Sequence, residues 1–502
     1  MVASGMKKVF SQVSILLLFC TMISCQTQDT QKAGSYQASW ESLTKHETPV
    51  WFRDAKFGIY FHWGPYSVPA YKTEWYSHYM YDKNHPIHQY HVEKYGPLDQ
   101  FGYKDFIPMF TAENFNADEW VSIFQKAGAQ FVGPVTEHAD GFAMWDSKLT
   151  KWDAMDMGPR RDIVGEMEKA VRKTDMKFIT TFHHQWLWSW YATWDKTTDA
   201  SNPEFEDLYG PNLDSSEFVG SEENPTFMAN EAFAERWITR LREVIDKYNP
   251  DLIYFDNKMN ILDEKYRLDF LQYYYNHAES RNQNVVVTYK AKDLQAGAGV
   301  LDLERARMSD KKDFPWLTDD SIDWSSWCNV ENPDYKSANR IIDFLVDVVS
   351  KNGGLLLNVT PTADGSIPQP VVDRLLEIGA WFDINGEAIY GSRPFEIYGE
   401  GPQEIVEGHL SERQNKDATA EDIRFTTNGE ALFAIALDWP KDQLVIHSLG
   451  SNSAYLVDGI ERIELLGSAE EISFERQANA LIIDLPGEAP GRHAFAFKIV
   501  AF

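Results

Sequence analysis

One pattern constrains the fold more than any other feature of the sequence: a short apolar run that ends abruptly at polar residues. Six such runs occur, at residues 57–61, 131–135, 178–182, 252–255, 285–288 and 355–357. They are rich in β-branched and aromatic residues and almost unbroken in hydrophobicity, which is typical of parallel strands buried on both faces. We therefore expect a parallel sheet whose strands end in polar, functional side chains.

Helical patterns separate these runs. From Phe233 to Tyr248, apolar residues recur at spacings of three and four, which places one apolar stripe on one helix face. Pro250 ends that helix, and the next run begins at once. The repeated alternation predicts a (β/α)8-like barrel with its active site at the carboxyl ends of the strands. An open doubly wound sheet is the alternative, but we find no glycine-rich dinucleotide motif and no phosphate loop.

The pattern changes near residues 384–394. Beyond them helical periodicity disappears, and short alternating apolar stretches are separated by Gly, Asn and Pro, which predicts an antiparallel β-sandwich. A chain of 502 residues is also too long for a single hydrophobic core. We predict an α/β protein with a catalytic (β/α)8-like barrel at residues 37–392. A C-terminal β-sandwich domain at residues 393–502 is expected to have a packing or accessory role.

The N-terminus has the pattern of an export signal. Two lysines precede the apolar run 13–19, which is too short to span a bilayer. The residues before Cys25 resemble a bacterial lipoprotein cleavage site, which predicts a signal peptide at residues 1–24 and a lipid-anchored Cys25 with a tether, at residues 25–36. Plain secretion with cleavage nearby is the alternative. We expect an exported protein, periplasmic or anchored to the outer membrane, whose membrane contact is this anchor.

Charge and motifs argue against several functions. The formal net charge of −29 leaves no basic footprint of the kind that nucleic-acid binding needs. No HExxH or paired CxxC motif supports a metal, and the adjacent His183 and His184 would point to opposite sides of a strand. We therefore expect no metal and no cofactor. The oligomeric state stays open.

The tips of the predicted strands carry the candidate chemistry. Asp256 should face the same side of its strand as Tyr254, and a carboxylate that ends an apolar barrel strand is costly unless it is solvated or functional. A carboxylate that caps the following turn is the structural alternative. Carboxylates, imidazoles and indoles at one barrel mouth suit carbohydrate chemistry, because carboxylates react at the anomeric centre and indoles pack on sugar faces. The other tips supply His62, Glu74, Trp75, His138, Asp140, His183, His184, Tyr289 and Lys290.

A second carboxylate is needed for such chemistry, and Glu304 is a candidate. It lies in the loop expected after the strand that follows Asp256, so it can reach the same mouth. From the residues alone, Asp302, Asp310 and Asp313 are equally eligible, and a salt-bridged surface acid is a further alternative. The residues alone therefore leave the second carboxylate undecided.

Several motifs stand in a characteristic order between residues 51 and 394. They are Trp51-Phe52, Phe61-His62-Trp63-Gly64, Glu74-Trp75-Tyr76, Glu137-His138-Ala139-Asp140-Gly141-Phe142, Met157-Gly158-Pro159-Arg160, Leu252-Ile253-Tyr254-Phe255-Asp256 and Lys351-Asn352-Gly353-Gly354. As an ordered set they resemble family 29 of the glycoside hydrolases, the α-L-fucosidases. The resemblance implies a retaining exo-glycosidase, without a cofactor, that releases terminal α-L-fucose from fucosylated oligosaccharides or glycans.

The resemblance also assigns roles to residues. Asp256 matches the nucleophile that forms a covalent glycosyl-enzyme, and the segment with Glu304 matches the region of the acid/base. A retaining mechanism implies that the two carboxyl groups lie roughly 5–5.5 Å apart. The matches to sugar-contacting positions are His62, Glu74, Trp75 and His138, with His184 and Tyr254 matched by strand position only.

Two departures from the family pattern bear on specificity. Ala139 stands where the family has a second histidine, and Asn257 stands where a glycine usually follows the nucleophile. These changes keep two alternatives open. One is an α-galactosidase-like exo-glycosidase on the same scaffold, since galactose resembles fucose in ring stereochemistry. The other is a catalytically weak glycan-binding lipoprotein.

Overall fold

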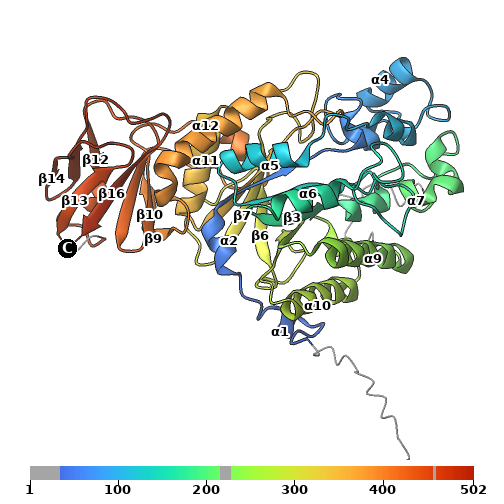
Figure 1. Ribbon diagram of the computed structural model, residues 1–502, viewed down its shortest axis with the longest axis horizontal. Helices are drawn as coiled ribbons and strands as arrows, with labels where there is room; N and C mark the ends of the chain where they lie inside the picture. Colours follow the sequence, from blue (N-terminus) through green and yellow to red (C-terminus); the bar gives the residue numbers. More distant parts are fainter. Residues whose placement is uncertain (1–33, 215–227, 456–458, 502) are drawn as a thin grey trace, which may run out of the picture.

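A computed structural model describes residues 34–214, 228–455 and 459–501. The first part is a closed barrel of eight parallel strands, each paired with the next in chain order and the last with the first (Figure 1). The strands are β1 (Phe57–Phe61), β2 (Phe131–Glu137), β3 (Lys177–Phe182), β4 (Leu252–Phe255), β5 (Val286–Lys290), β6 (Val300–Glu304), β7 (Trp316–Ser321) and β8 (Gly353–Val359). The predicted fold class, a (β/α)8-like barrel with a C-terminal β-sandwich, is confirmed.

The six apolar runs correspond to β1–β5 and β8, and the sequence pattern missed β6 and β7. Both missed strands carry acids: Asp302 and Glu304 in β6, and Asp319 and Asp320 in β7. These acids interrupt the apolar run by which a buried parallel strand is recognised. Both strands that the pattern missed therefore bring carboxylates to the barrel mouth.

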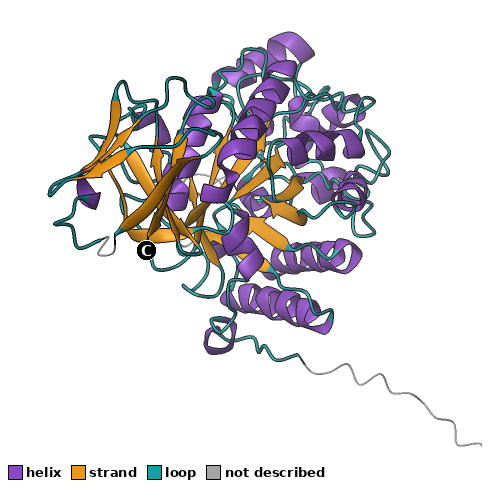
Figure 2. Ribbon diagram, turned by 60° about the vertical axis from the view of Figure 1, so that its left-hand side comes forward, coloured by secondary structure: helices purple, strands orange, loops and turns teal. Residues whose placement is uncertain are grey.

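Helices lie outside the barrel (Figure 2). They are α1 (Trp40–Leu43), α2 (Val50–Ala55), α3 (Tyr76–Tyr79), α4 (Pro86–Tyr95), α5 (Ala117–Lys126), α6 (Ile163–Val171), α7 (Glu206–Tyr209), α9 (Glu231–Tyr248), α10 (Glu264–Ser280), α11 (Ala338–Ser350) and α12 (Gln369–Asn385). Helix α9 begins where the Asn230 side chain accepts a hydrogen bond from the Phe233 amide, and it ends at Asn249, which is left-handed. Its apolar stripe is buried, as the spacing predicted.

Two connections of the barrel contain no helix. Residues 291–299 join β5 to β6, and residues 305–315 join β6 to β7, all within the described chain. A regular (β/α)8 barrel would have a helix in each connection. The barrel is therefore irregular on the side where β6 and β7 present their acids.

The C-terminal part consists of two antiparallel sheets that share one apolar core. One sheet has the order β13 (Ile460–Leu465), β16 (Phe495–Ala501), β11 (Ala431–Ala436), β10 (Ile423–Asn428) and β9 (Arg393–Glu400). The other has the order β12 (Gln443–Ile446), β15 (Leu481–Asp484) and β14 (Phe474–Arg476). These sheets lie at one end of the molecule, next to α11 and α12 (Figure 1).

A buried charge cluster joins the sheets to the barrel. Asp347 of α11 accepts hydrogen bonds from Lys351 at 2.8 Å and from Arg424 of β10 at 2.6 Å. All three side chains are at most 2% exposed. An unpaired charge at this depth would be costly, so Asp347 needs its cationic partners. Because Arg424 belongs to β10 and Asp347 to α11, this pairing fixes the sheets against the barrel.

The predicted signal peptide at residues 1–24, Cys25 and most of the tether lie outside the described residues. Among the described residues, we find no helix with the length and hydropathy needed to cross a membrane.

Candidate active site

A cavity of about 950 Å³ opens at the carboxyl ends of the barrel strands. Its walls come from several strand ends and from a segment of the C-terminal part. The lining includes Tyr60, His62, Glu74, Trp75, His138, His183, Trp186, Tyr254, Asp256, Lys290, Glu304, Arg305, Asp319, Trp324, Trp327, His409, Leu410 and Arg413. Active sites of barrels of this kind lie at this face, so the cavity is the candidate active site.

Strand alternation places Asp256 in the cavity. Along β4, Ile253 and Phe255 pack into the core outside the barrel, whereas Leu252 and Tyr254 belong to the apolar cluster inside it. Asp256 comes next in the inward series. Its backbone N–H donates to the carbonyl of Phe182 at 3.2 Å, which continues the strand pairing by one residue. The carboxylate is 23% exposed, so solvent and ligands reach it.

One ammonium group joins Asp256 to Glu304. The Nζ of Lys290 lies 3.6 Å from Oδ1 of Asp256 and 2.9 Å from Oε2 of Glu304. The two oxygens are therefore separated by at most the sum of these distances, about 6.5 Å, a limit that includes the roughly 5–5.5 Å of retaining glycosidases. The structure thus brings together the two carboxylates that the sequence proposed as a pair.

Two further carboxylates hold the same ammonium from below. Lys290 Nζ is 3.0 Å from Oδ1 of Asp319 and 3.5 Å from Oδ2 of Asp302, and the Tyr60 hydroxyl donates to Asp319 at 2.9 Å. Burial alone would lower the pKa of Lys290, but the surrounding carboxylates raise it well above its usual range. Burial and the neighbouring Asp319 raise the pKa of Asp302 well above that of an ordinary aspartate. Four carboxylates within 3.6 Å of its Nζ thus favour the charged form of Lys290 in the floor of the site.

The same neighbours set the titration of Asp256. Burial raises its pKa to about 7, Lys290 opposes this rise, and the charge of Glu304 adds to it. An ionised Asp256 at neutral pH therefore depends on Lys290.

Polar and aromatic side chains form the opposite wall. Asn358 Oδ1 lies 2.8 Å from Nδ1 of His62, so the amide oxygen accepts the Nδ1 proton and leaves Nε2 as the acceptor facing the cavity. Glu74 accepts hydrogen bonds from the Trp327 amide at 3.0 Å and from the Ser326 hydroxyl at 3.1 Å. The indole of Trp75 packs at 4.6 Å from that of Trp190, which holds it at the rim. The wall offers donors, acceptors and an aromatic platform, as a sugar requires.

Comparison with known proteins agrees with this chemistry. The family model for α-L-fucosidase matches residues 23–387, and the model for the α-L-fucosidase C-terminal domain matches residues 414–500.

The chain belongs to the α-L-fucosidase family.

It is 31% identical to tissue α-L-fucosidase of Rattus norvegicus over 466 residues, which cover 91% of this chain and 90% of the rat protein. It is 29% identical to tissue α-L-fucosidase of Homo sapiens over 511 residues, 99% of each chain. Among solved structures, the α-fucosidase of Thermotoga maritima in complex with fucose has a TM-score of 0.73 and 29% identity, covering 93% of this chain and 100% of that one. The family inferred from the ordered motifs is confirmed, and the chain is a glycoside hydrolase.

The structure does not bring one expected sugar-contacting position of this α-L-fucosidase family member to the cavity. His184 does not line the cavity: its ring stacks on Trp237 of α9, and its Nε2 lies 3.3 Å from the Trp237 carbonyl. His183 lines the cavity instead. In β3 the inward series is Ile179, Thr181 and then His183, so the odd-numbered histidine faces the cavity. The other expected contacts, His62, Glu74, Trp75, His138 and Tyr254, all line the cavity.

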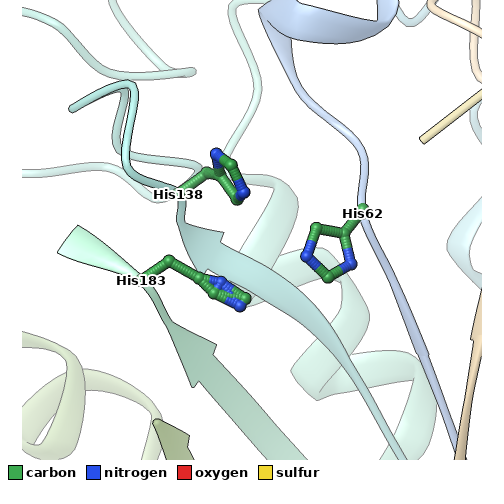
Figure 3. A group of neighbouring side chains, drawn as sticks. All are labelled: His62, His138 and His183. Carbon is green, nitrogen blue, oxygen red and sulfur yellow. The ribbon is translucent and has the colours of Figure 1, made fainter. Parts of the chain in front are cut away.

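Three histidines converge at the base of the cavity, and we name them the histidine triad: His62, His138 and His183 (Figure 3). Their ring centroids are 5.4, 4.9 and 5.0 Å apart, close to the roughly 5 Å expected of three imidazoles on one tetrahedral ion. Burial lowers the pKa of His62 to about 4 and that of the other two well below the usual range, so all three are neutral. Neutral imidazoles can hold either sugar hydroxyls or a transition-metal ion.

Ala139 has less effect on the site than its place in the motif suggested. It is 2% exposed, packs in the core outside the barrel, and does not line the cavity. Both ring nitrogens of His183 are buried without a hydrogen-bond partner among the described residues, so they are available to bind a ligand beside His138. An imidazole is thus present next to His138, although it comes from another strand.

Several site residues escaped the sequence interpretation. Lys290 was noted as a strand tip but not as the shared cation, and Asp319 lies in a strand that the pattern missed. Arg305, whose guanidinium lies 4.6 Å from the Trp327 ring centroid, follows Glu304 directly. The sequence signal that could have identified Arg305 is its position directly after the candidate carboxylate Glu304. His409, Leu410 and Arg413 come from the region expected to be accessory, and no local motif marks them.

Proposed function

We propose that this glycoside hydrolase is a retaining α-L-fucosidase that removes terminal α-L-fucose from glycans, with Asp256 as nucleophile and Glu304 as acid/base. The observation that carries the proposal is that both carboxylates contact the Nζ of Lys290 at the mouth of the barrel. Family membership favours this function over the α-galactosidase-like and binding-only alternatives.

The first half of the reaction forms the glycosyl-enzyme. An oxygen of Asp256 attacks the anomeric carbon while the bond to the leaving oxygen breaks, and that oxygen takes the proton of Glu304. Lys290 keeps Asp256 ionised before the attack, because its ammonium opposes the effect of burial on the pKa of that carboxylate. After the attack, the ester carries no charge, and Lys290 stays paired with Asp319 and Asp302.

The second half releases the sugar. Glu304, now ionised, takes a proton from a water molecule, whose oxygen attacks the anomeric carbon. The bond to Asp256 breaks and its electron pair returns to the carboxylate. Glu304 is 17% exposed on the cavity wall, so it can meet both the leaving group and the water that replaces it.

Glu304 fits the acid/base role better than the neighbouring acids. Asp302 does not line the cavity, and Asp319 is 2% exposed and paired with Lys290 beneath the cavity, so both are far less accessible than Glu304. Asp310 and Asp313 are exposed and do not line the cavity. A residue that first gives and then takes a proton must reach both the cavity and water.

The sugar-binding wall supports an exo-acting enzyme. His62, with its Nδ1 proton held by Asn358, presents Nε2 as an acceptor for a hydroxyl proton. Glu74 and His138 offer further polar atoms, and Trp75 offers an apolar face. A small ring enclosed in this way would be the terminal residue of a glycan.

The test is hydrolysis of α-L-fucosyl fluoride and aryl α-galactoside by the protein and its Asp256→Gly variant. We expect fucoside hydrolysis that the variant loses by several orders of magnitude, with little action on the galactoside. Azide should restore the turnover of a Glu304→Ala variant on an activated fucoside, since a small nucleophile replaces the activated water. Equal activity of parent and Asp256→Gly would refute the nucleophile.

We also propose that the protein is exported and anchored through a lipid on Cys25, in the periplasm or at the outer membrane. The apolar run 13–19 and the residues before Cys25 support this proposal. Mass spectrometry of the mature N-terminus in the native host should find an acylated cysteine, and Cys25→Ala should release the protein from the membrane fraction. An unmodified N-terminus at another residue would favour plain secretion.

A further inference from the structure

A long connection of the C-terminal part reaches back to the catalytic cavity. Residues 401–422 join β9 to β10, and we call them the arm. Glu412 fixes the arm to the barrel: its carboxylate accepts two hydrogen bonds from Arg307, at 2.7 and 2.6 Å, and one from Arg340 of α11 at 2.7 Å. Glu412 and Arg307 are 1% exposed. Such a buried, bidentate pair gives the arm a fixed position.

The tip of the arm touches the strand end that carries the acid/base. The Leu410 N–H donates to the Glu304 carbonyl at 3.0 Å, and the Glu412 N–H donates to the Arg305 carbonyl at 2.8 Å. These two bonds join the backbone of the arm to the carboxyl end of β6 and the residue after it. The arm therefore meets the site beside Glu304.

Leu410 is held in an unfavourable state at this tip. Its φ of 58° is in the left-handed region, which leucine rarely adopts, and its side chain is 48% exposed. An exposed apolar side chain in a strained conformation stabilises neither the fold nor the turn, and glycine would suit the backbone better. Strain of this kind is retained where the surroundings fix a side chain for a task.

The chemistry of the reaction says which side of the cavity this is. The acid/base protonates the leaving oxygen, so the groups next to Glu304 face the sugar that departs and not the fucose. The cavity wall on the arm includes His409, Leu410 and Arg413. Arg413 is 64% exposed and lies 3.6 Å from the equally exposed Asp334, so its guanidinium stays in water. Leu410 supplies the apolar part of the surface that the arm presents to the cavity.

We propose that Leu410 forms part of a leaving-group subsite, in which its side chain packs on the apolar face of the neutral sugar ring next to fucose. This subsite rests on the proposed α-L-fucosidase function and gives the C-terminal part a role in selecting the glycan. A neutral ring fits, because its C–H face can cover the exposed leucine while its hydroxyls stay in water.

The experiment compares Leu410→Gly with the parent on two substrates. Fucosyl fluoride has no leaving sugar, whereas a fucosylated neutral disaccharide has one, so the ratio of their kcat/KM values isolates the subsite. Glycine keeps the N–H bond to Glu304 and suits a φ of 58°, so thermal melting should show no loss of stability. We expect the ratio of disaccharide to fluoride to fall about fivefold, from the lost burial of part of one leucine.

Val406→Gly is the matched control. Val406 lies in the same arm and is 41% exposed, but it does not line the cavity. It should leave the substrate ratio unchanged. An unchanged ratio in Leu410→Gly, or an equal fall in both variants, would overturn the subsite. A parent protein that hydrolyses no fucosyl fluoride would instead overturn the proposed function, and the subsite with it.

Discussion

Replacing Lys290 by methionine should lower the activity mainly because it favours protonation of Asp256, the proposed nucleophile. The substitution keeps the length of the side chain but removes the ammonium that lies 3.6 Å from Asp256 and 2.9 Å from Glu304. At 3.6 Å and an effective dielectric constant of about 20, one charge stabilises the other by ~4–5 kcal/mol. Water in the cavity weakens this attraction, because Asp256 is 23% exposed.

If solvent removes about half of the attraction, the ionised nucleophile is destabilised by about 2 kcal/mol; because about half of Asp256 is ionised at neutral pH in the parent, this is roughly a 15-fold loss of kcat/KM at that pH. The direction of the pH effect follows from the proposed role of Asp256. Asp256 attacks only as a carboxylate, so activity is lost as the pH falls through its pKa, about 7 in the parent. Without Lys290 that pKa rises further. The acid limb of the pH profile should move to higher pH, and the loss of rate should shrink as the pH is raised.

The assay is kcat/KM for fucosyl fluoride as a function of pH. Lys292→Met is the control, because Lys292 lines the same cavity and has no ion pair with these carboxylates among the described residues. Circular dichroism and melting show whether Lys290→Met is folded. Neutral-pH activity of a folded Lys290→Met within twofold of the parent, or an acid limb that does not move, would refute this account of the site.

Three further results are expected. Asn358→Ala should raise KM for fucosides about tenfold at similar kcat, because the proton on Nδ1 of His62 loses its acceptor; a change in kcat alone would contradict this. Zn²⁺ should inhibit competitively with fucose and be reversed by a chelator, since the histidine triad can bind either; non-competitive inhibition would place the ion elsewhere. Arg424→Met should lower the free energy of unfolding by about 3–5 kcal/mol in a denaturant titration, because it removes a buried partner of Asp347. The exposed pair of Arg462 and Glu464 offers a control, whose loss should change the free energy of unfolding far less, because water screens exposed ion pairs.

Much of the barrel could be predicted because strands that are buried on both faces appear in the sequence as short, continuous apolar runs. Six strands are short apolar runs, and Asp256 stands out as the acid that ends one of them. The pattern failed at β6 and β7, where Asp302 and Asp319 lie inside the barrel and are tolerated because Lys290 from another strand lies 3.5 and 3.0 Å from them. That compensation joins separate strands, so no local window of sequence contains it.

The choice between His183 and His184 shows a different limit. Alternation says that the two must diverge, but not which of them faces inward. The register decides, since Thr181 pairs with Tyr254 and both belong to the inward series. Register is a property of two strands whose pairing residues lie far apart in the chain, so the pattern of one strand cannot supply it.

Because of the arm, the C-terminal part and the barrel are difficult to exchange separately in evolution. A recombination event that exchanged the C-terminal sheets would also remove Glu412 and leave Arg307 and Arg340 buried without their main counter-charge. The barrel cannot easily accept a foreign partner, so the pair is expected to descend together. However, the side chain at Leu410 can change by point substitution without altering the sequence of the strands that carry the proposed catalytic carboxylates. New preferences for the departing sugar can thus arise in one part of the molecule while the chemistry is preserved in the other.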